Sequence, residues 1–287
     1  MNVEWLVKQF INSRLTPEDV RKDLLEGGFS EELVNQAFAE FRKLTGSKKW
    51  LTPPPMLVED KTNENNWYPG ADLITDARFW PSLKDHLSTA KQWTPQAVQS
   101  IHDASDRIIA WLQSPWAASI KTRGLVVGYV QSGKTANFTA VIAKAADAGY
   151  RFFIVLSGTK TSLRSQTQRR LEQELIQLNP DIWFSPTTMH DFRPIGNVNF
   201  FLSDKKHDKV LCVVKKNSSI LKKLIAWLKS ASPDVLRQCP FLIIDDEADE
   251  ASVNTAKNQT QSDPENVDRT AINRHLVTLL NMLPKAA

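Results

Sequence analysis

The apolar residues in the second half of this chain alternate between short continuous runs and helical spacing. From residue 118 onward, the continuous runs predict strands, and segments with apolar positions three or four residues apart predict helices. The predicted strands are 124–128, 152–156, 210–214 and 241–245, and the predicted helices are 134–148, 161–178, 218–230 and 270–282. This alternation predicts an α/β fold in which helices cover both faces of a parallel sheet.

The first 117 residues follow a different pattern. Residues 1–45 have helical spacing interrupted by Gly27–Gly28, which predicts a small helical bundle. Residues 46–117 predict a linker with a stiff triple proline, followed by a helical lead-in that includes a helix from Thr94–Pro95 to about Gln113. The lead-in is rich in tryptophan. Spaced tryptophans either stack on bases or pack a helical layer onto a neighbouring domain, and packing is the commoner role.

Composition narrows the class of protein. A chain of 287 residues with 41% hydrophobic and 24% charged residues is typical of a globular protein of about two domains. The net charge of +4 permits nucleic-acid binding without requiring it. We expect a cytoplasmic protein with no membrane contact, because no apolar stretch approaches ~20 residues and the N-terminus lacks a signal-peptide layout. Cys212 and Cys239 lie in or beside apolar runs, which predicts buried, reduced thiols.

The segment from Gly128 to Thr135 reads G-x-x-x-x-G-K-T, the P-loop or Walker A pattern. It follows an apolar run and precedes an alanine-rich predicted helix, so a strand, a glycine loop and a helix come in the order that phosphate binding needs. Lys134 is predicted to reach the β- and γ-phosphates of ATP, and the Thr135 hydroxyl to bind Mg²⁺. The candidate nucleotide-binding residues are Gly128, Gln131, Ser132, Gly133, Lys134 and Thr135. The alternative is an ordinary glycine turn between a strand and a helix.

A second pattern joins the predicted strand 241–245 to a run of carboxylates. Residues 246–249 spell D-E-A-D, and a Walker B strand ends in acids of this kind. We predict that Asp246 holds the Mg²⁺ ion and that Glu247 is the catalytic residue that activates the attacking water. Asp245 could be the metal ligand instead, and Asp246 would then be an outer-shell group. The alternative is a solvated acidic turn after a strand.

A weaker pattern follows the predicted strand 152–156. The segment from Thr159 to Gln166 is similar to helicase motif Ia, although a glycine replaces the usual proline and one extra residue is inserted. Motif Ia grips a nucleic-acid backbone, so Thr159, Arg164 and Gln166 are candidate phosphate contacts. A solvated amphipathic helix is the alternative. Residues 213–217, with Lys215 and Lys216, are either a further backbone contact or a basic strand end.

Taken together, these segments resemble the Z-one domain proteins over residues 75–287. The segments that carry the resemblance are 124–135, 145–150, 163–171, 213–217 and 243–249. The resemblance implies a RecA-like P-loop lobe of a superfamily-2 helicase-like ATPase that uses ATP and Mg²⁺ on DNA, with restriction-type or antiphage defence proteins as partners. In that family the P-loop pair corresponds to Lys134 and Thr135, and the acidic pair to Asp246 and Glu247. Such proteins are often described as endonucleases, but no nuclease motif occurs in these 287 residues.

A motor of this kind needs a second RecA-like lobe, whose arginine stabilises charge in the transition state. This sequence contains no second alternating block, and a further strand is expected at 283–287. We therefore expect the N-terminal part of a longer protein, weak or inactive by itself. The alternatives are a non-motor P-loop switch that controls a protein partner, a small-molecule kinase, and a module that only binds. The paired acids suit water activation better than the transfer of a phosphoryl group to another acceptor.

Overall fold

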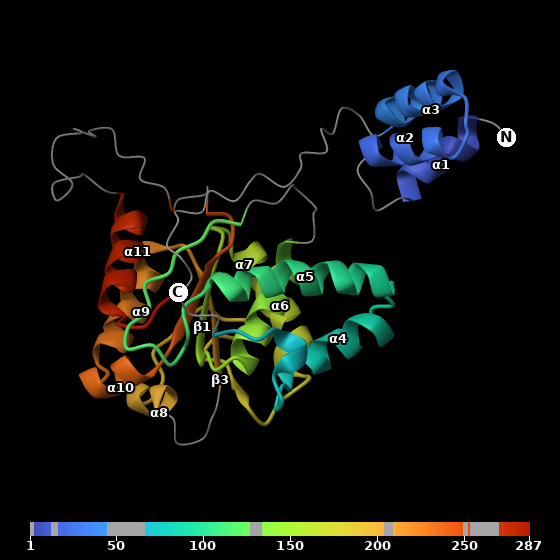
Figure 1. Ribbon diagram of the computed structural model, residues 1–287. Coiled ribbons are helices and arrows are strands. Elements are labelled where there is room, and N and C mark those ends of the chain that lie inside the picture. The colour runs from blue at the N-terminus through green and yellow to red at the C-terminus, as the bar shows by residue number, and fades with distance from the viewer. Residues whose placement is uncertain are drawn as a thin grey trace, which may run out of the picture. The chain divides into compact units, whose positions relative to one another are not determined.

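The computed structural model describes residues 3–12, 17–44, 67–126, 134–203, 209–248, 252 and 270–287 (Figure 1). The chain divides into two compact units, residues 1–63 and residues 64–287. The tryptophan-rich lead-in from residue 67 onward belongs to the same compact unit as the sheet. The predicted linker residues 46–66 lie outside the described part of the chain.

The first unit is the predicted helical bundle. It contains α1 (Val3–Asn12), α2 (Pro17–Glu26) and α3 (Glu31–Leu44). The helices share a small core made of Leu6, Val7, Val20, Val34 and Ala37. Between α2 and α3 the chain turns at Gly28, whose φ of 86° favours glycine.

The second unit is built on a parallel sheet in the order β2-β3-β1-β4. Its strands are β1 (Phe152–Ser157), β2 (Trp183–Phe184), β3 (Lys209–Lys215) and β4 (Phe241–Asp245). All the pairings are parallel, with Phe152 opposite both Val210 and Phe241. Every residue of β1 is buried, as the continuous apolar run predicts for a strand covered on both faces. The predicted α/β class with a parallel sheet is confirmed.

The predicted strand at 124–128 is wrong over its described residues. Residues 124–126 form no strand, and Leu125 and Val126 are 79% and 59% exposed. The backbone forms a β-bridge before this segment instead, where Ile120 bridges Lys285. Ala286 in turn bridges Phe241, and both bridges are parallel. The 283–287 segment, where a further strand was expected, thus lies between β4 and Ile120. An apolar run alone did not identify the pairing residue, because a strand also needs neighbouring backbone along its length.

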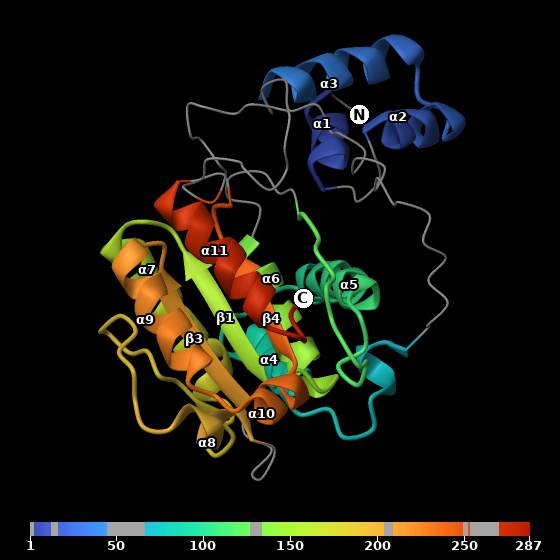
Figure 2. The same cartoon turned by 90° about the vertical axis from the view of Figure 1, so that its left-hand side faces the viewer.

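Helices cover both faces of the sheet (Figures 1 and 2). One face carries α6 (Lys134–Asp147), α7 (Thr161–Leu171) with its π-helical continuation η2 (Glu172–Ile176), α4 (Phe79–Thr89) and α5 (Pro95–Trp111), while η1 (Ala71–Leu73) lies at the edge of this layer. The other face carries α8 (Val198–Leu202), α9 (Ser218–Lys229), α10 (Pro233–Gln238) and α11 (Ala271–Met282). Helices α9, α10 and α11 lie in front of the strands in Figure 2.

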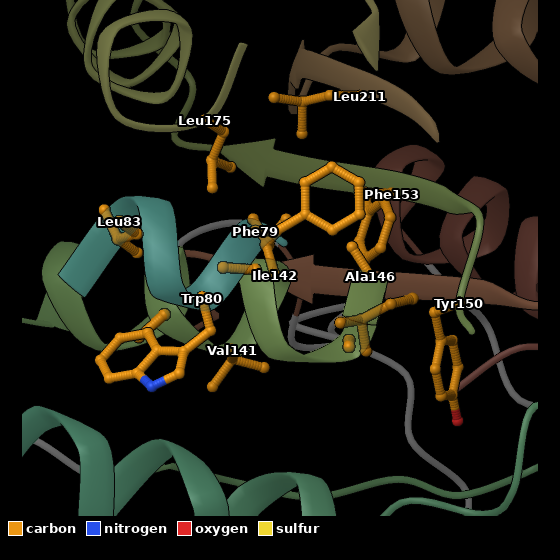
Figure 3. Packing of buried hydrophobic residues seen from close by; sticks show 14 of the residues in the cluster. Phe79, Trp80, Leu83, Val141, Ile142, Ala146, Tyr150, Phe153, Leu175 and Leu211 are labelled. Carbon is orange, nitrogen blue, oxygen red and sulfur yellow. The ribbon is translucent and has the colours of Figure 1, made fainter. Parts of the chain in front are cut away.

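Helix α6 lies in the middle of the first face and is buried on almost all sides. Residues 139–146 are all buried, because the sheet lies on one side of α6 and the helices α4 and α5 pack on the other (Figure 3). Trp80 of α4 is 1% exposed, while Trp67 and Trp93 pack against the same core. These tryptophans therefore pack a helical layer, as expected, whereas Trp116 is 79% exposed. Cys212 and Cys239 are buried and form no disulfide, as predicted.

A buried ion pair joins α5 to α6. The Lys144 ammonium is 2.7 Å from Oδ1 of Asp106, donates to the carbonyl of His102 at 2.8 Å, and lies 4.4 Å from the centre of the Trp80 ring. The Tyr68 hydroxyl also donates to Asp106 at 2.7 Å. Burial raises the pKa of Asp106, but the hydrogen bonds from Lys144 and Tyr68 outweigh it and hold that pKa below its usual value.

Breaking this pair is expected to destabilise the α/β unit. Asp106→Asn removes the ion-pair partner of the fully buried Lys144 ammonium, so we expect a loss of about 3 kcal/mol in the free energy of unfolding. The double variant Asp106→Leu with Lys144→Met removes both charges and should recover most of that loss. Urea unfolding of the three proteins measures the difference. An equal loss in the double variant would show that packing, not charge pairing, sets the stability here.

Candidate functional site

The candidate site lies at the carboxyl edge of the sheet. Because all the strands run parallel, β1, β3 and β4 end at this same edge, where Leu156 pairs with Asp245 and Ser157 with Lys215. The polar residues that follow each strand are therefore neighbours in space. Open α/β sheets bind their ligands beyond the carboxyl ends of the strands.

Two predicted site residues from distant parts of the sequence, Lys134 and Asp246, interact electrostatically here. Lys134 is the first residue of α6 and is exposed, whereas Asp246 directly follows β4 and is partly buried. Burial raises the pKa of Asp246 above its ordinary value, and the positive charges of Lys134 and Lys216 oppose that rise. The structure thus brings the P-loop lysine and the acid after β4 into one electrostatic environment.

The P-loop itself is only partly described. Thr135 follows Lys134 in the first turn of α6 and is half-buried, and its carbonyl accepts a hydrogen bond from the Thr139 hydroxyl at 2.7 Å. The predicted phosphate-cradling residues Gly128, Gln131, Ser132 and Gly133 lie outside the described residues. The amino end of α6 carries partial positive charge, which together with Lys134 favours an anionic ligand at this point.

The acidic turn after β4 distinguishes its three carboxylates. The Asp246 amide donates to the Leu156 carbonyl at 3.0 Å, so the ladder with β1 continues one residue past the strand. Asp245 forms an ion pair with Lys216, with 2.7 Å between the ammonium and Oδ1 of the carboxylate. The angles at this Oδ1 atom are not those of a hydrogen bond. Asp246 interacts with Lys134. Asp245 thus has a direct ion-pair partner, whereas the Asp246 carboxyl group is influenced by both Lys134 and Lys216.

Glu247, the predicted water-activating residue, occupies an unusual backbone conformation. Its φ of 59° lies in the left-handed region that residues with a Cβ atom seldom adopt. Its side chain is partly exposed, and its carbonyl accepts a hydrogen bond from Lys216. Backbone conformations of this kind occur often at functional sites, where the surrounding structure holds them.

The predicted nucleic-acid residues occupy different environments. Gln166 is exposed and Thr159 is half-buried. Arg164 is fully buried, and its guanidinium donates to the carbonyls of Met189 at 3.0 Å and Val213 at 3.2 Å. In this conformation Arg164 joins α7 to β3 and to the chain after β2, so it cannot contact a phosphate backbone. The prediction failed because a basic residue at a helix start is normally solvated, and the carbonyls that bind it come from distant segments.

Lys216 was expected to contact nucleic acid or to end a strand as a solvated base. Its side chain is instead completely buried against the acidic turn. Lys215 takes the outer position, where its ammonium donates to the Thr161 hydroxyl at 3.1 Å. The basic pair Lys215–Lys216 was visible in the sequence, but the sequence did not indicate which lysine faces inward.

Comparisons with protein-family models, with curated proteins and with solved structures found no match to this chain. Among the described residues, no cluster of three or more His, Cys, Asp or Glu side chains could hold a metal ion. In the described part of the chain, no helix has both the length and the apolar character needed to cross a membrane. The geometry at the carboxyl edge of the sheet is therefore the main basis for a functional assignment.

Proposed function

We propose that the α/β unit binds ATP with Mg²⁺ and hydrolyses it. The observation that carries this proposal is the placement of Lys134 at the amino end of α6 and of Asp246 directly after β4, where the charge of Lys134 acts on the Asp246 carboxyl group. Lys134 would bind the β- and γ-phosphates, while Thr135 and Asp246 would supply oxygen ligands to the metal. Mg²⁺ held by these residues would supply positive charge that offsets the negative charge of the phosphates. Such an ion needs only one or two protein ligands, because the phosphates and water supply the others.

Glu247 has the chemistry to take part in hydrolysis. A carboxylate next to the metal ligand can orient a water molecule and accept its proton as the water attacks the γ-phosphate. A kinase must instead exclude water from its acceptor. The two adjacent acids Asp246 and Glu247 therefore favour hydrolysis over transfer to another substrate.

We further propose that this unit is the first RecA-like lobe of a Z-one type, superfamily-2 helicase-like ATPase that moves along or remodels DNA in a defence system. The parallel sheet supports a RecA-like lobe, and the sequence motifs support this family. The burial of Arg164 weakens the predicted DNA contact at α7, and Gln166 and Thr159 remain as candidates. The alternative is a P-loop switch that controls a protein partner without nucleic acid.

Stimulation by DNA distinguishes a motor from a switch. If the intact protein is a motor, single- or double-stranded DNA should raise its ATPase kcat at least tenfold, because movement couples hydrolysis to the strand. The measurement is steady-state ATP hydrolysis with and without DNA at fixed ionic strength, because binding to the phosphate backbone depends on salt. A rate unchanged by DNA or RNA would favour the switch.

A further inference from the structure

Lys216 is a cation held in the interior at the edge of the candidate site. Its side chain has 0% exposure. Its backbone is fixed at the end of β1, because its amide donates to the carbonyls of Ser157 and Gly158, each at 3.2 Å. Burying an ammonium group costs free energy unless nearby groups compensate its charge. The groups that Lys216 contacts therefore indicate its structural role.

Those contacts lie on the acidic turn. The Lys216 ammonium is 2.7 Å from Oδ1 of Asp245 and donates to the backbone carbonyl of Glu247 at 2.5 Å. In the sheet, β3 and β4 are separated by β1. The Lys216 side chain therefore crosses the end of β1 and binds the turn on both sides of Asp246.

The hydrogen bond to Glu247 falls where the backbone needs support. Glu247 has a φ of 59°, a conformation that costs free energy for a residue with a Cβ atom. Donation from Lys216 fixes the carbonyl of this residue and hence the direction of its peptide plane. The ion pair with Asp245 holds the other end of the turn, and the Asp246 carboxylate accepts from the Glu247 amide between them.

We propose that Lys216 is a positioning residue that fixes the turn 245–247, so that Asp246 keeps its place after β4 and Glu247 is presented from a single backbone conformation. This inference rests on the proposed ATPase function for its catalytic consequence. The holding of the turn itself depends only on the contacts of Lys216. A neutral side chain of similar length could fill the same space, but it could neither donate to the Glu247 carbonyl nor pair with Asp245.

The test compares Lys216→Met with Lys209→Met. Lys209 lies at the opposite end of β3, where its ammonium donates to the Tyr150 carbonyl at 3.1 Å, so the control removes a similar bond away from the site. Amide exchange of the Asp246 peptide should become at least tenfold faster in Lys216→Met and stay unchanged in Lys209→Met. The kcat for ATP should fall at least thirtyfold in Lys216→Met, while the dissociation constant for ATP changes less than threefold.

A second variant separates positioning from folding. Lys216→Met leaves Asp245 without its counter-charge, so Asp245→Asn is combined with it to remove both charges. The double variant should regain stability and still show the fast exchange at Asp246. Unchanged exchange at Asp246, or faster exchange throughout the α/β unit, would overturn the proposal. If the wild-type protein shows no ATPase activity, the proposed function fails, and the exchange pattern still decides whether Lys216 holds the turn.

Discussion

Lys134→Ala is expected to lower kcat/KM for ATP hydrolysis by the intact protein at least a hundredfold, or about 2.7 kcal/mol of transition-state stabilisation. Lys134 is exposed at the amino end of α6, where its charge acts on Asp246, and no large packing contact should be lost with it. Its ammonium would act on the phosphate oxygens, where negative charge has to be stabilised during transfer. Steady-state hydrolysis at saturating Mg²⁺ measures the effect.

The control for this variant is Lys223→Ala. Lys223 is exposed on α9, which covers the opposite face of the sheet from α6, and removing it changes the net charge by the same amount. We expect its activity to match that of the wild-type protein. If Lys134→Ala retains full activity, the assignment of the P-loop is wrong. If both variants lose activity equally, the loss reflects overall charge and not the site.

Glu247→Gln is expected to keep ATP binding and to stop turnover. Glutamine has the same shape but cannot accept a proton, so the affinity for ATP should change less than threefold, while kcat should fall about a thousandfold. The backbone at φ 59° already tolerates a side chain of this size. Equilibrium binding of a fluorescent ATP analogue and single-turnover hydrolysis separate the two effects.

Glu32→Gln serves as the matched control, because Glu32 is exposed in the helical bundle and the change is chemically identical. It should leave both binding and turnover unchanged. Loss of ATP binding in Glu247→Gln would mean that this residue holds the metal and does not activate water. Normal turnover would move the catalytic role to another carboxylate.

The sequence predicted the elements with strong periodicity. The helices predicted at 134–148, 218–230 and 270–282 match α6, α9 and α11 to within about a residue, and three predicted strands match β1, β3 and β4. The two-residue strand β2 was missed, because so short a segment carries no alternation. The strand at 124–128 was predicted from local apolarity, which does not reveal the neighbouring backbone.

The candidate site, like the fold, was predicted only in part. The sequence predicted that Lys134 begins a helix and that Asp246 follows a strand, and the structure has both at these positions. The roles of Arg164 and Lys216 were not predictable in this way. Both are basic residues near element ends, where solvent is the usual partner, yet here buried carbonyls and a carboxylate from other segments surround them. Contacts between distant segments decide burial at such positions.

The most direct test of the ATP site is calorimetric titration of ATP with Mg²⁺ into the wild-type intact protein and into Lys134→Ala. The account predicts one ATP bound per wild-type chain and an affinity at least a hundredfold weaker in the variant. Absence of ATP binding in the wild-type protein, or equal affinity in the two proteins, would contradict it.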